Sequence, residues 1–324
     1  MNILFIHQGF PGQYRHILRA LSGQGEHRLV GMGLSTPTES LPEGVHFVQY
    51  GLERGNALEV HPWALETESK VLRGEACAKA AFVLHGQGFI PDLICAHPGW
   101  GEALFIKDIW PLAPLLTFQE FYYHCKGFDY DFDSELQGEP GWQECAYLRM
   151  KNANILVNLE ASDWSVTPTY FQRSTFPAQW QKRISCIHDG IDTEAAAPDQ
   201  HVPPLILPDG MKVSQGEPII TFVNRCVEPY RGCHTFLRAL PTIQMLYPDA
   251  QVVIVGEQSG VSYGKAAPGG SWKNVFLNEL ENKIDLNKVS FTGSLPYQHF
   301  LQLLKITSVH VYLTYPFVLS WSLL

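Results

Sequence analysis

Short apolar runs alternate with longer amphipathic segments along the whole chain. A short run bounded by turn-forming residues predicts a buried strand, and apolar residues that recur every three or four positions predict a helix. Helices are predicted over Tyr14–Ser22 and Leu65–Leu84. In the first part of the chain the runs predict strands over Asn2–His7, His27–Gly33, Leu93–Ala96, Pro114–Phe118, Asn154–Asn158 and Ile184–Ile187.

A second series of the same kind follows Ala195–Gln215, a segment rich in Pro, Asp and Gly. Clusters of turn-forming residues are typical of linkers, so we expect one domain over residues 1–200 and another over residues 201–324. Strands alternate with apolar helices in both parts, which predicts an α/β fold of two doubly wound parallel-sheet domains. The elements of the second series are predicted over Ile219–Val223, His234–Leu246, Gln251–Val255, Trp272–Lys283, Val289–Thr292, Tyr297–Ile306 and Val309–Leu313.

Composition narrows the class of protein. The 324 residues carry 23 Lys and Arg against 32 Asp and Glu, a formal net charge of −9, which argues against a nucleic-acid partner. The sequence has neither a signal-peptide pattern nor an apolar run of about 20 residues, the length of a membrane helix. We therefore expect a cytoplasmic protein, with peripheral contact at the inner membrane surface left open. Seven scattered cysteines without a C-x-x-C pair predict reduced thiols.

The segment Phe222–His234 leaves a predicted strand, crosses a short loop and enters a predicted helix. It brings Arg225 and Arg231, two permanent cations, to a helix N-terminus, whose free N–H groups also attract anions. Gly232 lets the backbone approach a ligand closely. The segment therefore predicts a site for a phosphate or diphosphate. In the alternative interpretation, the two arginines are surface residues paired with Glu228 and a neighbour.

The loop after the first predicted strand contains Gly9, Gly12 and Gln13. Glycines at this position allow a tight turn and leave backbone amides facing the predicted cleft between the domains. A plain strand-to-helix turn is the alternative interpretation of the same residues.

Polar and aromatic residues also follow two other predicted strands. His97 comes directly after Leu93–Ala96, and Glu120 follows Pro114–Phe118. Ligands of open α/β sheets bind at the carboxyl ends of strands, so His97 and Glu120 are candidates for polarising or deprotonating a hydroxyl group. The neighbouring aromatic residues that we expect to stack on a sugar are Trp100, Tyr122 and Tyr123.

Two further patterns only superficially resemble known binding motifs. Gly86-Gln87-Gly88 lacks the third glycine of a dinucleotide fingerprint and precedes a predicted strand instead of following one. The spacing of Cys95, His97, His124 and Cys125 fits no established zinc pattern, so we expect no metal site.

The segment around Arg225 resembles the donor-phosphate loop of GT-B glycosyltransferases of family 4. In that loop an Arg, and six residues later a Lys followed by Gly, grip the diphosphate of a nucleotide sugar. Arg225 matches the Arg, and Arg231 stands where Lys is usual. Four other segments resemble family motifs in the same order along the chain: Ser165–Gln172, Ile187–Asp192, Val253–Glu257 and Phe291–Pro296. By the same resemblance the residues near the nucleotide are Gly256, Glu257, Ser294 and Leu295.

The resemblance implies a GT-B fold, in which two Rossmann-like domains face each other across a cleft. It implies transfer of a sugar from a nucleotide-diphosphate sugar to a hydroxyl acceptor, with retention of configuration and without a metal or other cofactor. The acceptor would be a glycan, a lipid-linked sugar or a small molecule, as in polysaccharide biosynthesis, and would bind near Gly12 and His97.

The chain departs from the family pattern at three positions. Gln119 stands where many members have a His directly after the strand. Of two donor-site glutamates usual in the family, the first position is taken by Phe317 and the second would come after Leu324. We therefore expect a second domain that is incomplete, or truncated.

The departures keep a second hypothesis open, a catalytically impaired remnant that only binds a nucleotide or glycan. A third, a nucleotide-sugar epimerase or dehydrogenase, is ranked last because the glycine fingerprint and a following Tyr-x-x-x-Lys pair are missing.

Overall fold

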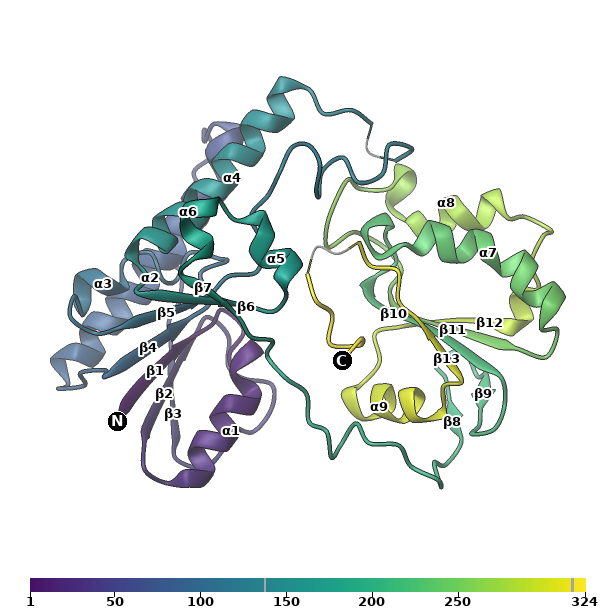
Figure 1. Ribbon diagram of the computed structural model, residues 1–324, viewed down its shortest axis with the longest axis horizontal. Helices are drawn as coiled ribbons and strands as arrows, with labels where there is room; N and C mark the ends of the chain where they lie inside the picture. Colours follow the sequence, from purple (N-terminus) through teal and green to yellow (C-terminus); the bar gives the residue numbers. More distant parts are fainter. Residues whose placement is uncertain (137, 316–317) are drawn as a thin grey trace. The chain divides into compact units, whose positions relative to one another are not determined.

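The computed structural model describes residues 1–136, 138–315 and 318–324. It divides into two compact units (Figure 1). Unit 1 consists of Met1–Asp131 and Glu139–Gly190, and unit 2 of Phe132–Gly138 and Ile191–Leu324. The main boundary therefore lies at Gly190, where the sequence pattern predicted residue 200. The pattern also did not indicate that a short segment from the first half of the chain packs within unit 2.

Unit 1 is built on a parallel sheet of seven strands in the order β3-β2-β1-β4-β5-β6-β7. The strands span β1 Asn2–Ile6, β2 Arg28–Gly33, β3 Val45–Gln49, β4 Leu93–Ala96, β5 Leu115–Phe118, β6 Trp164–Thr167 and β7 Ile184–Cys186. The α-helices span α1 Arg15–Gln24, α2 Leu65–Gly86, α3 Ile106–Ile109, α4 Trp142–Ala161, α5 Tyr170–Thr175 and α6 Ala178–Gln181.

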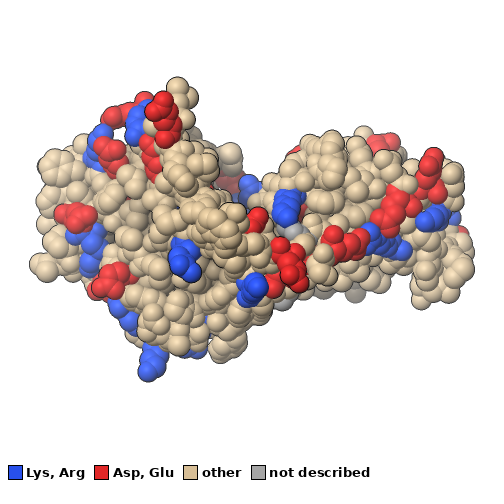
Figure 2. Space-filling view, turned by 90° about the horizontal axis from the view of Figure 1, so that it is seen from above, with Lys and Arg blue, Asp and Glu red and all other residues tan. Residues whose placement is uncertain are grey.

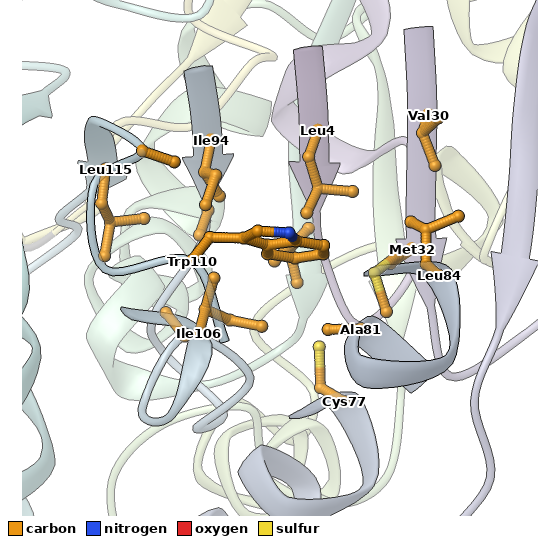
Figure 3. Close-up of a cluster of buried hydrophobic side chains, with 14 of the residues drawn as sticks. Leu4, Val30, Met32, Cys77, Ala81, Leu84, Ile94, Ile106, Trp110 and Leu115 are labelled. Atoms are coloured by element: carbon orange, nitrogen blue, oxygen red, sulfur yellow. The ribbon is translucent and has the colours of Figure 1, made fainter. Parts of the chain in front are cut away.

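Successive residues of the central strand β1 pack on opposite faces of this sheet. Leu4 and Ile6 face α2 and α3, in a cluster that contains Trp110 (Figure 3). Ile3 and Phe5 face α1 on the other side, together with residues such as Leu18. A strand that is apolar on both faces needs helices on both faces, and this is why unit 1 is doubly wound.

One strand of unit 1 was predicted wrongly. Asn154–Asn158 lies inside α4, and the backbone N–H of Gly141 ahead of this helix donates to the Glu144 carboxylate at 3.0 Å. Within it Ile155 and Leu159, one turn apart, are buried, whereas Val157 between them is exposed. The run of apolar letters therefore has a helical period, which a short window could not separate from a strand.

Unit 2 contains a smaller parallel sheet with the strand order β12-β11-β10-β13. Its strands are β10 Ile219–Cys226, β11 Gln251–Glu257, β12 Val289–Gly293 and β13 Val309–Val311. Helices α7 Cys233–Leu246 and α8 Trp272–Glu279 pack on one face and α9 Tyr297–Ile306 on the other. The prediction of an α/β fold with parallel sheets is confirmed for both units.

The predicted linker is only partly a linker. Two short strands, β8 Leu205–Ile206 and β9 Lys212–Val213, form an antiparallel hairpin around the Pro-Asp-Gly turn. Leu205 and Val213 are buried beside strands β10 and β11. The turn-forming residues therefore mark a hairpin that belongs to the core of unit 2.

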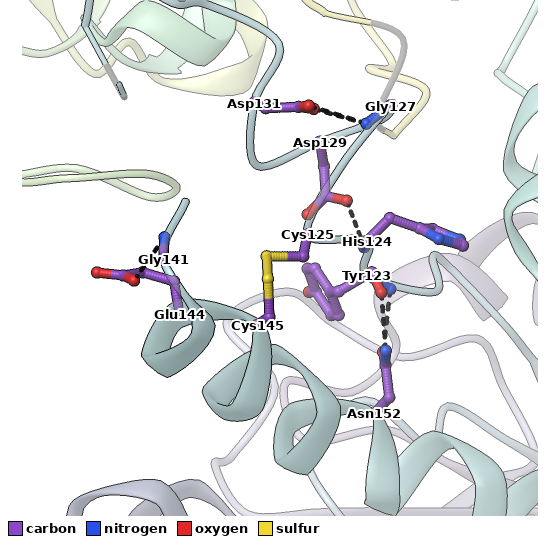
Figure 4. The surroundings of a disulfide bond; sticks show 10 residues. All are labelled: Tyr123, His124, Cys125, Gly127, Asp129, Asp131, Gly141, Glu144, Cys145 and Asn152. Atoms are coloured by element: carbon purple, nitrogen blue, oxygen red, sulfur yellow. Dashed lines mark hydrogen bonds between the residues drawn. A yellow bond between two sulfur atoms is a disulfide. The ribbon is translucent and has the colours of Figure 1, made fainter. Parts of the chain in front are cut away.

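The prediction that all seven cysteines are reduced is wrong for two of them. Cys125 and Cys145 form a disulfide within unit 1, with their Cα atoms 5.1 Å apart (Figure 4). The two residues are 20 positions apart, and only the fold of the intervening loop brings them together. The free cysteines of the described chain are Cys77, Cys95, Cys186, Cys226 and Cys233.

Candidate active site

The predicted donor-site residues gather at the carboxyl end of the sheet in unit 2. Arg225 is the last residue but one of β10 and is exposed. Gly256 and Glu257 end β11, and Ser294 directly follows β12. Because these strands are parallel, their ends meet at one edge of the sheet, where ligands of open α/β folds bind.

Arg231 lies on the short 3₁₀ turn Pro229–Arg231 that leads into α7. It is only 7% exposed. Its Nε lies 3.6 Å from Oε1 of Glu228, and its guanidinium carbon lies 5.4 Å from the centre of the Tyr263 ring. In the part of the chain that the structure describes, this Nε has no hydrogen-bond partner. The Arg231 guanidinium is thus held in place, and its Nε–H remains able to donate a hydrogen bond.

Glu228 is fully buried and is fixed from its other side. Its Oε2 accepts hydrogen bonds from the backbone N–H groups of Ser262 and Tyr263. Burial raises the pKa of Glu228, while these N–H groups, Arg231 and Arg225 oppose the shift. Pairing with Glu228 was the alternative interpretation of the two arginines, and it describes Arg231 in part. Arg225 has no ion pair or hydrogen bond among the described residues.

Gly232 and Gly256 allow the chain to pass close to itself at this edge. Gly232 has φ = +75°, and a Cβ there would lie 2.5 Å from the Cβ of Leu313 and 2.7 Å from its backbone oxygen. At Gly256, with φ = +143°, a Cβ would lie 2.5 Å from the backbone oxygen of Asn224. Only glycine fits either position, so the loops keep both arginines beside the strand ends.

The other two residues predicted near the nucleotide differ in their surroundings. The Ser294 hydroxyl donates to Oε1 of Glu257 at 2.7 Å, which joins the ends of β11 and β12. Leu295 packs against the core beside β10 and α9, so its side chain has a structural contact.

In unit 1 the residues that follow β1, β4 and β5 lie together. His7 and His97 are buried, and their ring centres are 5.2 Å apart. In both residues Nδ1 accepts the backbone N–H two positions later, from Gly9 at 3.0 Å and from Gly99 at 3.2 Å. An imidazole that accepts at Nδ1 carries its proton on Nε2. Both rings therefore present Nε2–H as a donor.

His7 was not singled out from the sequence, although it follows its strand as His97 does. Burial, and then the neighbouring His97, lower the pKa of His7 to about 3. Its ring is therefore neutral at physiological pH. Any side chain at Gly12 would collide with it, since a Cβ there would lie 2.3 Å from Nε2 of His7. Gly12 is thus needed for packing in this loop.

Glu120 lies at the same place and is partly exposed. Its Oε1 accepts a hydrogen bond from Nε2 of Gln13 at 3.3 Å and lies 3.6 Å from Nε2 of His97. The fold therefore brings together three of the residues predicted from separate loops: Gln13, His97 and Glu120. A carboxylate beside an imidazole N–H can accept a proton from a hydroxyl group that binds between them. Gln119 instead points inward and donates to Thr117 at 3.0 Å.

A pocket of about 210 Å³ opens beside His97 and Glu120. Trp100 and Tyr123, two of the aromatic residues expected to stack on a sugar, line it. Trp100 stacks on the His97 ring with centres 4.4 Å apart. Tyr122 does not line it, and packs against Phe176 instead. The pocket is also lined by Glu66, Lys70 and Lys151, which come from α2 and α4 and were not predicted.

On the surface in view, the Lys and Arg side chains do not gather into one area. In Figure 2, Lys and Arg are interspersed with Asp and Glu, and the drawn face of the described residues has no broad basic area. Among the described residues, no group of three or more His, Cys, Asp or Glu is arranged to hold a metal ion.

Known structures with this architecture include several enzymes of sugar transfer. The chain is similar to sucrose-phosphate synthase from Thermosynechococcus elongatus, with TM-score 0.65 and 16% identity over 99% of this chain and 77% of that one. It is also similar to the catalytic domain of starch synthase IV from Arabidopsis thaliana bound to ADP and acarbose, with TM-score 0.57 and 13% identity over 95% and 77%. Two doubly wound units of this kind define the GT-B fold.

The same fold occurs outside sugar transfer. A Listeria monocytogenes protein assigned as a UDP-N-acetylglucosamine 2-epimerase matches with TM-score 0.53 and 11% identity, over 95% of this chain and 73% of that one. At such identities the likeness is one of fold alone.

Family models separate these possibilities. Residues 25–196, more than half of the chain, match the glycosyl transferase family 4 group, and residues 209–315 match glycosyl transferases group 1. The chain therefore belongs to the glycosyl transferase family 4 group and is a glycosyltransferase. A search of curated protein sequences returned no significant match.

None of the helices in the described residues is both long and apolar enough to cross a membrane.

Proposed function

We propose that this glycosyltransferase moves a sugar from a nucleotide-diphosphate sugar, bound at Arg225, Arg231 and Gly232, to a hydroxyl acceptor bound beside His97 and Glu120. The donor assignment rests on the burial of the two arginines and on their unused hydrogen-bond donors. One is buried with an unused Nε–H, and the other is exposed without a partner among the described residues. Both lie at the carboxyl end of a parallel sheet, where ligands of such folds bind.

The two guanidinium groups supply the chemistry that leaving-group departure needs. A diphosphate gains negative charge as its bond to the sugar breaks, and fixed cations stabilise that charge in the transition state. Arginine stays protonated at any physiological pH and can bind phosphate oxygens in a bidentate manner. In this proposal no metal is required, and the sugar keeps its anomeric configuration, as the family resemblance implies.

In the acceptor pocket, the Glu120 carboxylate accepts the proton of the attacking hydroxyl group. Nε2–H of His97 donates a hydrogen bond to the oxygen of that hydroxyl group. A neutral His7 behind His97 adds no competing charge. We further propose that the loop of Gly9, Gly12 and Gln13 orients these groups, since Gln13 donates to Glu120.

Calorimetric titration of the purified chain with UDP, GDP and ADP, and with their glucose or mannose conjugates, tests the donor site. Arg225→Ala should weaken binding about 10- to 100-fold, because one charge-assisted contact is worth about 1.5–3 kcal/mol. Arg225 has no ion pair or hydrogen bond within residues 1–136, 138–315 and 318–324, so its loss should leave the fold intact. Lys288→Ala is the matched control, since Lys288 precedes β12 and lies at the opposite end of the same sheet.

Arg231→Lys is preferable to Arg231→Ala, which would leave Glu228 buried without its cation. The lysine variant should retain most of the binding. Equal binding by wild type and Arg225→Ala would contradict the donor assignment.

Product analysis tests the reaction. Nucleoside diphosphate released only when an acceptor is present indicates transfer, and NMR of the new glycosidic bond reports retention or inversion. Undiminished turnover in excess chelator is expected. An epimerised nucleotide sugar would indicate the activity assigned to the Listeria neighbour. Binding without turnover would favour the remnant hypothesis raised by Phe317, a position outside the described residues.

A further inference from the structure

The charged side chains of the acceptor pocket are distributed unequally between its two ends. Near His97 it presents the Glu120 carboxylate and aromatic rings, whereas its other end presents Lys70 and Lys151 around the single carboxylate of Glu66. Nζ of Lys70 lies 3.4 Å from Glu66, and Nζ of Lys151 lies 3.8 Å from it. Glu66 is thus shared by two cations, and it also accepts a hydrogen bond from the Tyr147 hydroxyl.

The two ammonium groups keep most of their donor capacity. An ammonium group has three N–H donors. Lys70 donates one hydrogen bond, to Glu66, and Lys151 donates none among the described residues. Their side chains are only 13% and 25% exposed. Burial lowers the pKa of Lys70, and Glu66 opposes this shift. A partly buried cation with unused donors gains from an anionic partner.

Both lysines are held at the pocket rather than free to turn away. Nζ of Lys151 lies 4.2 Å from the centre of the Tyr123 ring. The backbone of Tyr123 is fixed in turn by Asn152, whose side chain bonds to its N–H and its carbonyl oxygen (Figure 4). Lys70 is held by its ion pair with Glu66, one turn earlier on α2. Arg73, also on α2, interacts electrostatically with Lys70, and Asp129 does so with Lys151, although neither lines the pocket.

We infer that the acceptor carries an anionic group, a phosphate or a carboxylate, which binds Lys70 and Lys151 while its hydroxyl lies at Glu120 and His97. The inference rests on the proposed function, because it assigns this pocket to the acceptor. A volume of about 210 Å³ is below the usual range for drug-sized ligands. It suits a single sugar unit with one charged substituent.

The test compares charged sugars with their uncharged parents. Direct binding is measured by calorimetry for the 6-phosphates of glucose, mannose and fructose, for glucuronate and galacturonate, and for the parent sugars. At least one charged sugar should bind about tenfold or more tightly than its parent. A phosphate should bind more tightly as the pH rises through its second pKa of about 6, whereas a carboxylate should not, so this dependence separates the two sources of charge.

Three variants sharpen the test. Lys70→Gln and Lys151→Gln should each weaken binding of the charged sugar about tenfold and leave the parent sugar unaffected. Glu66→Gln should strengthen binding of the charged sugar, because it removes a carboxylate that competes for the two lysines. Lys79→Gln is the matched control, since Lys79 lies on the same helix but pairs with Glu53 and Glu75 away from the pocket. If the lysines merely neutralise Glu66, then Glu66→Gln will not strengthen binding.

The outcomes separate this inference from the donor assignment. Lysine-dependent binding of a charged sugar supports the inference even if no nucleotide binds, in which case the proposed function alone fails. If nucleotides bind at Arg225 but no charged sugar binds more tightly than its parent, the inference is overturned and the proposed function stands.

Discussion

The two sites that we propose differ in the chemical groups that they contain. In unit 2 the functional groups are Arg225 and Arg231, whose positive charge does not depend on pH. In unit 1 they are the carboxylate of Glu120, the imidazole of His97 and the lysines of the pocket. A diphosphate leaving group needs fixed charge, whereas a hydroxyl acceptor must pass on a proton. This difference is the reason why we propose leaving-group stabilisation for unit 2 and proton transfer for unit 1.

The largest expected effect separates these two roles. Arg225→Ala should lower turnover about 100- to 1,000-fold, the usual loss for one group that stabilises transition-state charge. Glu120→Gln should lower it about 100-fold or more by removing the base. Arg225→Ala should also weaken nucleotide binding, whereas Glu120→Gln should leave nucleotide binding unchanged. Equal loss of nucleotide binding in the two variants would contradict the division of roles.

The disulfide joins two residues of unit 1, and the loop that it closes includes the segment Phe132–Gly138 of unit 2. A crosslink that closes a loop of about 20 residues stabilises the folded state by about 3 kcal/mol in the chain-entropy account. Cys125→Ser should therefore lower the free energy of unfolding by about that amount, measured with urea. Cys186→Ser, which removes a free thiol, is the control. If nucleotide binding by unit 2 falls as far as stability does, the two units do not act separately.

Gly232 tests how tightly the donor loop is built. Gly232→Ala should destabilise the protein by about 2–4 kcal/mol, through a left-handed backbone and a collision with Leu313. Gly210→Ala separates the two causes, because Gly210 has φ = +90° but open space around its Cα. It should cost about 1 kcal/mol. Equal costs for both variants, measured by urea unfolding, would show that the contact with Leu313 is unimportant.

The smallest expected effect concerns His7. Its folded-state pKa is about 3 against an ordinary value of 6.5, so the unfolded chain binds the extra proton between these values. The stabilising contribution is complete above pH 6.5 and is lost as the pH falls toward 3, by up to about 1.4 kcal/mol per pH unit. His7→Asn, whose Oδ1 can accept the Gly9 N–H, should flatten the pH dependence of urea unfolding between pH 7.5 and 5. His201→Asn, at an exposed position, is the control.

Much of the fold was predictable because its elements have clear local patterns. Strands β1 and β4 and helix α9 were found within a residue or two of their observed bounds. Strand β3, Val45–Gln49, was missed because it lies at the sheet edge and is only partly buried. The segment Asn154–Asn158 was mistaken because five residues are too few to separate two periods.

The candidate site was predictable where its residues follow strand ends. Gly9, Gly12, Gln13, His97 and Glu120 could be proposed in this way, as could the arginine loop of unit 2. Lys70 and Lys151 could not, because on their own helices they look like ordinary solvent-facing lysines. Their importance comes from the packing of α2 and α4 beside the ends of β4 and β5.

The sequence by itself determined the alternation of strands and helices, the parallel sheets and the loops that carry polar residues, since all of these follow from short-range periodicity. Only the tertiary structure decided which distant groups meet. It joined Cys125 to Cys145, set Glu120 beside His97, and aimed two lysines at one carboxylate. These contacts depend on how helices pack over the sheet, and no local pattern of residues records that packing.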